Sequence, residues 1–296
     1  MVSTPDLPDR VRLVPGDLDR LVVDAPSATA EIYLQGAHVT AWAPQSQAPV
    51  LFTSTASAFQ EGRAIRGGIP LCFPWFGPGE SRDRSPAHGF ARVRPWELVE
   101  AVEEGDAVTV VLRLTDDERT RAAWPHAFEA IYRVTVGQSL TLALEVRNTG
   151  PVPARYDEAL HTYLAVSDVA SIRVRGLEGV RFTDEAAGTE GTESEPVTFD
   201  GALVDRLYPG TDADVVVEDP GHGRWIRTRT ERSHSRIVWN PGAEKAEAMA
   251  DLETREWRHM VCTEVGNVWP DAVELAPGET HTLTAEIAVG TLDGEA

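Results

Sequence analysis

The chain has 296 residues and a formal net charge of −20, from 47 acidic and 27 basic side chains. With 42% hydrophobic and 25% charged residues, it has the composition of a globular protein and not of a disordered one. This negative charge disfavours nucleic acid and anionic membranes as partners, because both carry like charge. The first residues show no signal-peptide pattern, and no stretch reaches the ~18 apolar residues of a membrane span. We therefore expect a cytoplasmic protein.

Short segments with alternating apolar side chains follow one another along the chain. They predict strands at 21–23, 31–34, 108–114, 128–136, 140–146, 172–174, 224–228 and 282–289. Segments 128–136 and 140–146 are separated by Gly137-Gln138, which predicts a hairpin. Helical patterns are short, at 116–123 and 243–252, and the polar segment 186–195 is expected to be an exposed loop. The pattern predicts an all-β protein, a large antiparallel sandwich or barrel, in a single domain over residues 1–296.

Several common catalytic signatures are absent from the sequence. It contains no G-x-x-x-x-G-K-[ST], strand-linked G-x-G-x-x-G, H-E-x-x-H or G-x-S-x-G motif. The two cysteines, Cys72 and Cys262, are too few for a disulfide framework, and we expect two separate buried thiols. No C-x-x-C motif occurs, so a thiolate zinc site is not expected.

Two unusual segments combine glycine with cationic side chains. In segment 64–77, Arg66 precedes two glycines, which would let the backbone approach a ligand closely. A tight turn that carries a surface arginine explains the same pattern. In segment 88–92, His88 and Arg92 could face one cleft, although a lone histidine is more often a structural residue.

Two further segments place polar side chains among apolar ones. If segment 158–164 is a strand, His161 and Tyr163 share one face. Such a polar face inside a sandwich costs desolvation unless it serves a site or is fully hydrogen-bonded. In segment 260–267, Glu264 stands among apolar and small residues. Burial there would raise its pKa and prepare it as a proton carrier, whereas pairing with a nearby arginine is the structural alternative.

Taken together, these segments resemble the aldose 1-epimerase (mutarotase) superfamily. Within it they resemble the branch of glucose-6-phosphate 1-epimerases, also called D-hexose-6-phosphate mutarotases. The resemblance spans almost the whole chain in the family's order. It rests on the motifs GAHV (36–39), IRGGIP (65–70), HGFAR (88–92), HTY (161–163), DRLY (205–208), VWNP (238–241) and CTE (262–264).

The resemblance implies a galactose-mutarotase-like β-supersandwich of antiparallel sheets with few short helices. It implies interconversion of the α and β anomers of a hexose, here a hexose 6-phosphate, without a cofactor or a metal. Glu264 matches the general base that takes the proton of the C1 hydroxyl, and His161 matches the general acid that protonates the ring oxygen. The substrate-binding residues that it implies are Arg66, His88, Arg92 and Asp205.

Three points stay open at this level. Arg82 and Arg84 could extend the phosphate site or could be solvated loop charges. The chain could be an aldose 1-epimerase for an unphosphorylated sugar, or a non-catalytic sandwich that binds a sugar phosphate. Arg66 and Arg92 favour a phosphorylated substrate, and an acid together with a base favours an enzyme. We expect a monomer whose partner is a small-molecule sugar phosphate, with no nucleic acid and no membrane.

Overall fold

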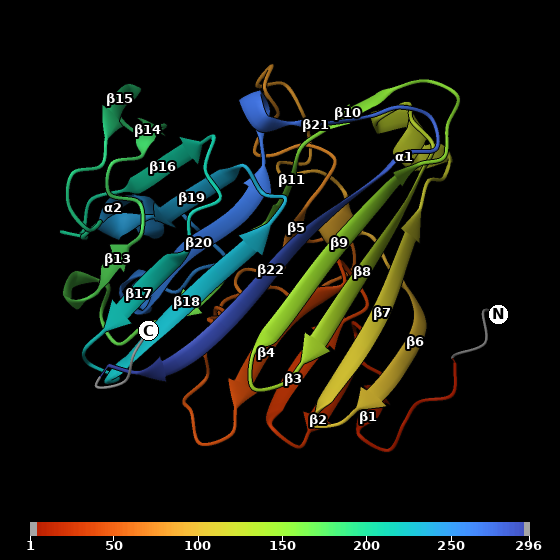
Figure 1. Cartoon of the computed structure of the whole chain (residues 1–296), viewed down its shortest axis with the longest axis horizontal. Helices are drawn as coiled ribbons and strands as arrows, with labels where there is room; N and C mark the ends of the chain where they lie inside the picture. The colour runs from red at the N-terminus through yellow and green to blue at the C-terminus, as the bar shows by residue number, and fades with distance from the viewer. Residues whose placement is uncertain (1–4, 293–296) are drawn as a thin grey trace.

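The computed structural model describes residues 5–292, which form mainly antiparallel strands (Figure 1). In β8 (Phe128–Val136) and β9 (Leu140–Asn148) every second side chain is buried, because successive side chains of a strand point to opposite faces. The two strands pair as a hairpin in which Val136 lies opposite Leu140. The predicted antiparallel β-sandwich and this hairpin are therefore confirmed.

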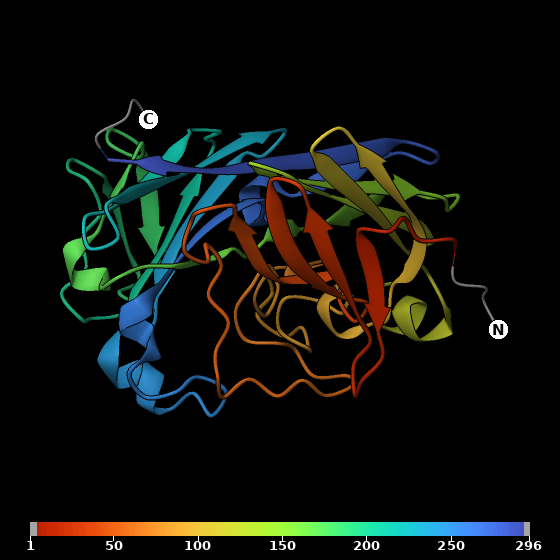
Figure 2. The same cartoon turned by 90° about the horizontal axis from the view of Figure 1, so that it is seen from below.

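The outer layer is a sheet of eight strands in the order β13-β17-β18-β22-β9-β8-β7-β6. Its other members are β13 (Arg173–Arg175), β17 (Val215–Asp219), β18 (Arg224–Glu231), β22 (Thr280–Thr291), β7 (Ala107–Thr115) and β6 (Glu97–Glu104). A sheet of four strands packs against one part of it, as Figure 2 shows, with β2 against β7 and β3 against β8. This small sheet contains β1 (Val11–Val14), β2 (Arg20–Ala25), β3 (Ala28–Tyr33) and β4 (His38–Pro44).

A second sheet of eight strands carries the site described below. Along its main path the order is β15-β14-β16-β19-β20-β11-β5, and β12 also pairs with β20. The strands are β15 (Thr189–Thr192), β14 (Arg181–Asp184), β16 (Val204–Pro209), β19 (Ser235–Asn240), β20 (Met260–Asn267), β11 (Glu158–Leu160), β5 (Leu71–Cys72) and β12 (Tyr163–Ala165).

The remaining elements are short. Strands β10 (Ala154–Tyr156) and β21 (Val273–Leu275) form a separate pair. The helices are α1 (Glu118–Ala123), α2 (Gly242–Glu247) and the 3₁₀ turns η1 (Ala91–Val93), η2 (Val169–Ser171), η3 (Glu256–His259) and η4 (Trp269–Asp271). Within residues 5–292, no helix has the length and apolar character needed to cross a membrane.

Strand β20 is buried along its whole length, which means that both of its faces are covered. Val261 and Val265 belong to the main core, whereas Cys262 belongs to a second apolar cluster on the opposite face. Because side chains alternate, Glu264 lies on the face of Cys262 and not on that of the main core. The sheet thus places a carboxylate in a covered, largely apolar layer.

Three local predictions need correction. Segment 186–195 is not entirely loop, because it contains β15, whose exposed polar residues hide the usual strand pattern. Segment 158–164 is not one strand, because β11 ends at Leu160 and β12 begins at Tyr163. Between them the His161 N–H donates to the Pro70 carbonyl. The second predicted helix is shorter than 243–252, and α2 ends at Glu247.

The glycines that follow Arg66 serve close packing of the chain against itself. Gly67 and Gly68 have φ values of +105° and +62°. A Cβ on Gly67 would lie 2.4 Å from the Phe52 carbonyl oxygen, and one on Gly68 would lie 2.3 Å from the Val39 carbonyl oxygen. The backbone therefore approaches its own neighbours here and not a ligand, while Arg66 reaches into a cavity.

Replacing Gly68 with alanine tests this packing. Gly68→Ala introduces both a left-handed alanine and a backbone clash, so we expect the free energy of unfolding to fall by more than about 2 kcal/mol. Gly62 is a matched control, because its φ is +74° and its Cβ position is open. Gly62→Ala should cost only about 1–2 kcal/mol, the penalty of a left-handed alanine without a clash. Urea denaturation measures both, and equal losses would contradict the close approach.

Candidate active site

The second eight-stranded sheet and the loops at its edge enclose a cavity of about 330 Å³. This volume suits a small ligand such as a monosaccharide. Five of the six predicted site residues line it, and the exception is Arg92. The full lining is Arg66, Phe76, Gly77, Pro78, Arg82, His88, His161, Tyr163, Glu185, Asp205, Ile237, Trp239, Lys245, Met249, Glu264 and Trp269.

His161 and Glu264 meet in the wall of this cavity. Glu264 comes from β20, opposite Ile237, and His161 follows β11 directly. The distance from His161 Nδ1 to Glu264 Oε1 is 3.3 Å, and both side chains are buried. The Tyr163 ring stacks on the imidazole with 4.8 Å between ring centroids and 8° between planes. The shared face that was predicted for His161 and Tyr163 is confirmed, although the strand is interrupted.

Burial shifts the pKa values of this pair in opposite directions. Desolvation disfavours the carboxylate, so it raises the pKa of Glu264 well above its ordinary value, as the sequence predicts. Desolvation disfavours the imidazolium and lowers the pKa of His161 well below its ordinary value, and the neighbouring His88, Arg92 and Arg66 act in the same direction. Both shifts favour an uncharged pair near neutral pH, in which Glu264 is a protonated carboxyl and His161 is a neutral imidazole.

His88 stands beside this pair as a neutral hydrogen-bond donor. Its ring lies 5.3 Å from that of His161, measured between centroids. The Gly77 N–H donates to His88 Nδ1 at 3.2 Å, which assigns the ring proton to Nε2. Burial lowers the pKa of His88 well below its ordinary value, and Arg92 and Arg66 lower it further. A neutral Nε2–H can donate to a sugar hydroxyl over a wide pH range.

Arg66 and Arg92 lie near each other beside the histidines. Arg66 donates to the Tyr163 hydroxyl at 2.8 Å and to Asp251 at 3.0 Å. Arg92 donates to the Ala87 carbonyl at 2.7 Å. Burial lowers the pKa of the Arg92 guanidinium, and repulsion by Arg66 contributes. The Nε atoms of both arginines are buried without a partner among the described residues, so the two guanidiniums retain capacity for an anion.

The structure separates the two loop arginines that the sequence left open. Arg82 lines the cavity, forms an ion pair with Glu185 at 2.5 Å, and lies over the Trp269 ring at 5.2 Å. Arg84 lies instead over Trp75 and donates to the Ala123 carbonyl, outside this cavity. Of these two loop arginines, only Arg82 is therefore placed to contact a ligand in the cavity.

Sequence reasoning missed Trp269 and Glu185 as parts of the cavity. Trp269 lies in η4 and Glu185 follows β14, and neither belongs to a motif that points to sugar chemistry. The one signal in the sequence is that Trp269 is aromatic, since aromatic side chains are common in ligand cavities. That signal does not identify which aromatic residue the fold brings to the site.

His161, Cys262 and Glu264 are the residues here that could hold a metal ion. One donor atom from each lies within 4.8 Å of the others, and all three residues are buried. Nitrogen, sulfur and oxygen donors suit a zinc-like cation. The same His161 and Glu264 atoms are those that an acid–base reaction needs, so the two uses exclude each other. Both thiols are free, as the sequence predicts.

Asp205 adds a carboxylate whose charge depends on pH. It lies on β16 opposite Trp239, and burial raises its pKa to about 6. Lys245 opposes this shift, because a nearby positive charge favours the carboxylate. The Lys245 ammonium also lies 5.9 Å from the centroid of the Trp239 ring. Asp205 is thus ionised at neutral pH and loses its charge on mild acidification.

The titration of Asp205 is measurable by carboxyl ¹³C NMR. We expect one aspartate signal with a pKa near 6 that is missing from Asp205→Asn. Lys245→Gln should raise that pKa further, since it removes the opposing charge. A signal for Asp205 that titrates near 4, or one that ignores Lys245→Gln, would contradict this electrostatic description.

Comparisons with known proteins agree with this geometry. The aldose 1-epimerase family matches residues 19–288. The chain is 35% identical over 271 residues to a candidate glucose-6-phosphate 1-epimerase of Salmonella typhimurium, covering 91% of this chain and 90% of that protein. It is 36% identical over 253 residues to one from Escherichia coli, covering 84% and 83%. The crystal structure of YeaD, a candidate mutarotase from Salmonella typhimurium, matches with a TM-score of 0.90 and 32% identity over 97% of this chain and 95% of that chain. The expected mutarotase-like fold is confirmed, and the chain belongs to the aldose 1-epimerase family.

Proposed function

We propose that this chain is a cofactor-independent mutarotase that interconverts the α and β anomers of a hexose 6-phosphate, with glucose 6-phosphate as the first candidate. The observation that carries the proposal is the buried pair of His161 and Glu264, 3.3 Å apart in the wall of a sugar-sized cavity. Relatives named as candidate glucose-6-phosphate 1-epimerases, at 35% and 36% identity, support the choice of substrate.

The uncharged pair accounts for both halves of the reaction. Transfer of its proton from Glu264 to His161 gives a carboxylate and an imidazolium. Glu264 then takes the proton of the C1 hydroxyl while the C1–O5 bond breaks, and His161 delivers its proton to O5. The open-chain aldehyde faces the neutral pair again. After rotation about C1–C2, the same groups act in reverse and close the ring on the other face.

Each side chain around the pair has a role in this proposal. His88 donates from Nε2 to a sugar hydroxyl, and the Asp205 carboxylate accepts from others. Arg66 lines the cavity and holds the phosphate, because a guanidinium matches phosphate oxygens with several parallel donors. Arg92 does not line the cavity but lies near Arg66 and His161, and it takes part in holding the phosphate through its positive charge. An anion near both arginines would also offset the desolvation and the repulsion by Arg66 that lower the pKa of Arg92.

Composition and family membership are the basis for proposing the domain organisation, oligomeric state, location and partner of the protein. We propose that residues 1–296 act as one domain and as a monomer in the cytoplasm, with a sugar phosphate as partner. Support comes from one family that matches residues 19–288. The net charge of −20 further supports a function that involves neither nucleic acid nor an anionic membrane surface.

Removing the carboxylate tests the reaction. Glu264→Gln keeps the shape of the side chain but cannot take a proton, so we expect kcat to fall by about 10²–10⁴-fold. Exchange NMR on glucose 6-phosphate in dilute buffer measures the rate. Glu247→Gln is a matched control, because it makes the same change at an exposed glutamate of α2 outside the cavity, and it should stay within about threefold of the wild-type rate. A Glu264→Gln enzyme with the wild-type rate would exclude this mechanism.

Removing Arg92 tests the phosphate. Arg92→Ala should raise KM for glucose 6-phosphate roughly tenfold or more, since it removes a positive charge beside the phosphate. KM for glucose should change little. Arg84→Ala removes a guanidinium that lies over Trp75 in another cavity and should leave both values unchanged. Equal losses for both sugars in Arg92→Ala would assign Arg92 a structural role and favour the unphosphorylated substrate.

A further inference from the structure

One wall of the substrate cavity is built from two segments that are distant in sequence. Phe76, Gly77, Pro78 and Arg82 come from the loop after β5, and Trp269 comes from η4. We call these residues the aromatic wall. Phe76 and Trp269 meet edge to face with 5.8 Å between ring centroids, and Arg82 lies over the Trp269 ring.

The carboxylate of Asp157 holds both segments of the aromatic wall. Asp157 follows β10, is 6% exposed, and does not line the cavity. Its Oδ2 accepts from the Phe76 N–H at 3.0 Å, and its Oδ1 accepts from the Trp269 N–H at 2.9 Å. A carboxylate can accept from both N–H groups at once, and no neutral side chain of the same shape can do so.

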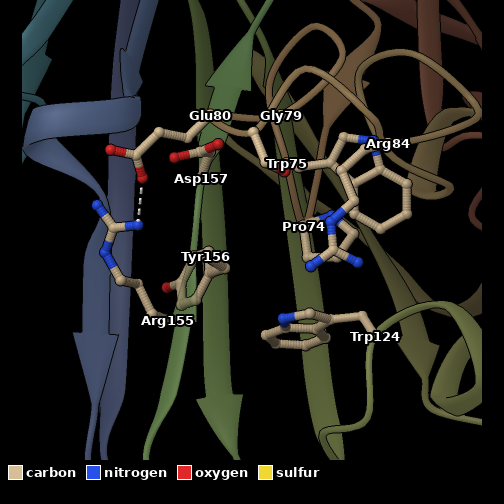
Figure 3. A pocket seen from close by; sticks show the side chains of 10 residues that line it. Pro74, Trp75, Gly79, Glu80, Arg84, Trp124, Arg155, Tyr156 and Asp157 are labelled. Atoms are coloured by element: carbon tan, nitrogen blue, oxygen red, sulfur yellow. Dashed lines mark hydrogen bonds and ion pairs between the residues drawn. The ribbon is translucent and has the colours of Figure 1, made fainter.

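Arg155 also connects the loop after β5 to Trp269 through hydrogen bonds. It donates to Glu80 at 2.8 Å, within the loop, and to the Trp269 carbonyl at 2.7 Å. Figure 3 shows Glu80 bonded to Arg155, with Asp157 beside them. The Trp269 residue is therefore held at its N–H by Asp157 and at its carbonyl by Arg155.

The loop part of the aromatic wall has a further partner, His88, whose N–H donates to the Gly77 carbonyl at 2.6 Å and whose Nδ1 accepts from the Gly77 N–H at 3.2 Å. Asp157 and Arg155 themselves line a second cavity of about 340 Å³, together with Trp75, Glu80, Arg84 and neighbouring residues (Figure 3). Open space on that side supplies no packing atoms, so Asp157 and Arg155 act on the wall through their hydrogen bonds. Trp269 also has a φ of +53°, a left-handed conformation that persists only where the surroundings fix it.

We propose that Asp157 is a positioning residue for the hexose-6-phosphate reaction, acting through the backbones of Phe76 and Trp269 on the shape of the cavity. This inference rests on the proposed function. Asp157 acts on sugar binding and not on proton transfer, because its carboxylate bonds to the backbones of Phe76 and Trp269 and to neither His161 nor Glu264.

The test compares two buried aspartates. Asp157→Asn keeps one acceptor but turns an N–H donor toward the second N–H. We expect KM for glucose 6-phosphate to rise about tenfold, with kcat within about twofold and an unchanged pH profile of kcat. Asp219→Asn is the matched control, because Asp219 is fully buried, accepts the Ser167 N–H at 3.0 Å and lies outside the cavity. It should lower stability but leave KM unchanged.

A second variant keeps the test decisive if Asp157→Asn folds poorly. Arg155→Ala changes a half-exposed side chain and should raise KM about threefold through the same wall. An active wild-type enzyme together with unchanged KM in both variants would overturn the positioning role alone. A fall in kcat without a rise in KM would also overturn it. Absence of wild-type acceleration on every hexose would overturn the proposed function, and this role with it.

Discussion

The structure depends on one constraint, the burial of a carboxylate and an imidazole against each other. Strand β20 is covered on both faces, so Glu264 has no access to bulk water except through the cavity. In that setting neither the carboxylate nor the imidazolium is favoured by itself. The two groups can share one proton, and this gives the site a base and an acid that exchange roles, as a reversible ring opening requires.

The net negative charge of the protein opposes binding of its proposed anionic substrate only at long range. A chain at −20 repels a sugar phosphate at a distance. At physiological salt the Debye length is roughly 8 Å, so local arginines decide the interaction inside the cavity. Lys245 is the one lysine, and 26 of the 27 basic side chains are therefore arginines. Arg66, Arg82 and Arg92 are the three that the fold brings to or beside the site.

Much of the fold and of the site could be predicted from the sequence, for physical reasons. Period-two alternation identified β8 and β9, because one face of each strand is buried. Glu264 stood out because a carboxylate among apolar residues has few explanations. The polar hairpin of β14 and β15 carried no such signal, since neither of its faces is buried. Trp269 and Asp157 act through long-range backbone contacts, which local sequence does not reveal.

The central claim is that the buried pair carries a single proton and that His161 is neutral in the free protein. Imidazole ¹⁵N NMR, with His161→Asn used for assignment, measures this most directly. The account predicts that His161 gives the shifts of a neutral imidazole at pH 7, with a pKa well below its ordinary value. A His161 that is an imidazolium at pH 7, or that titrates as an exposed histidine near 6.5, would contradict the account.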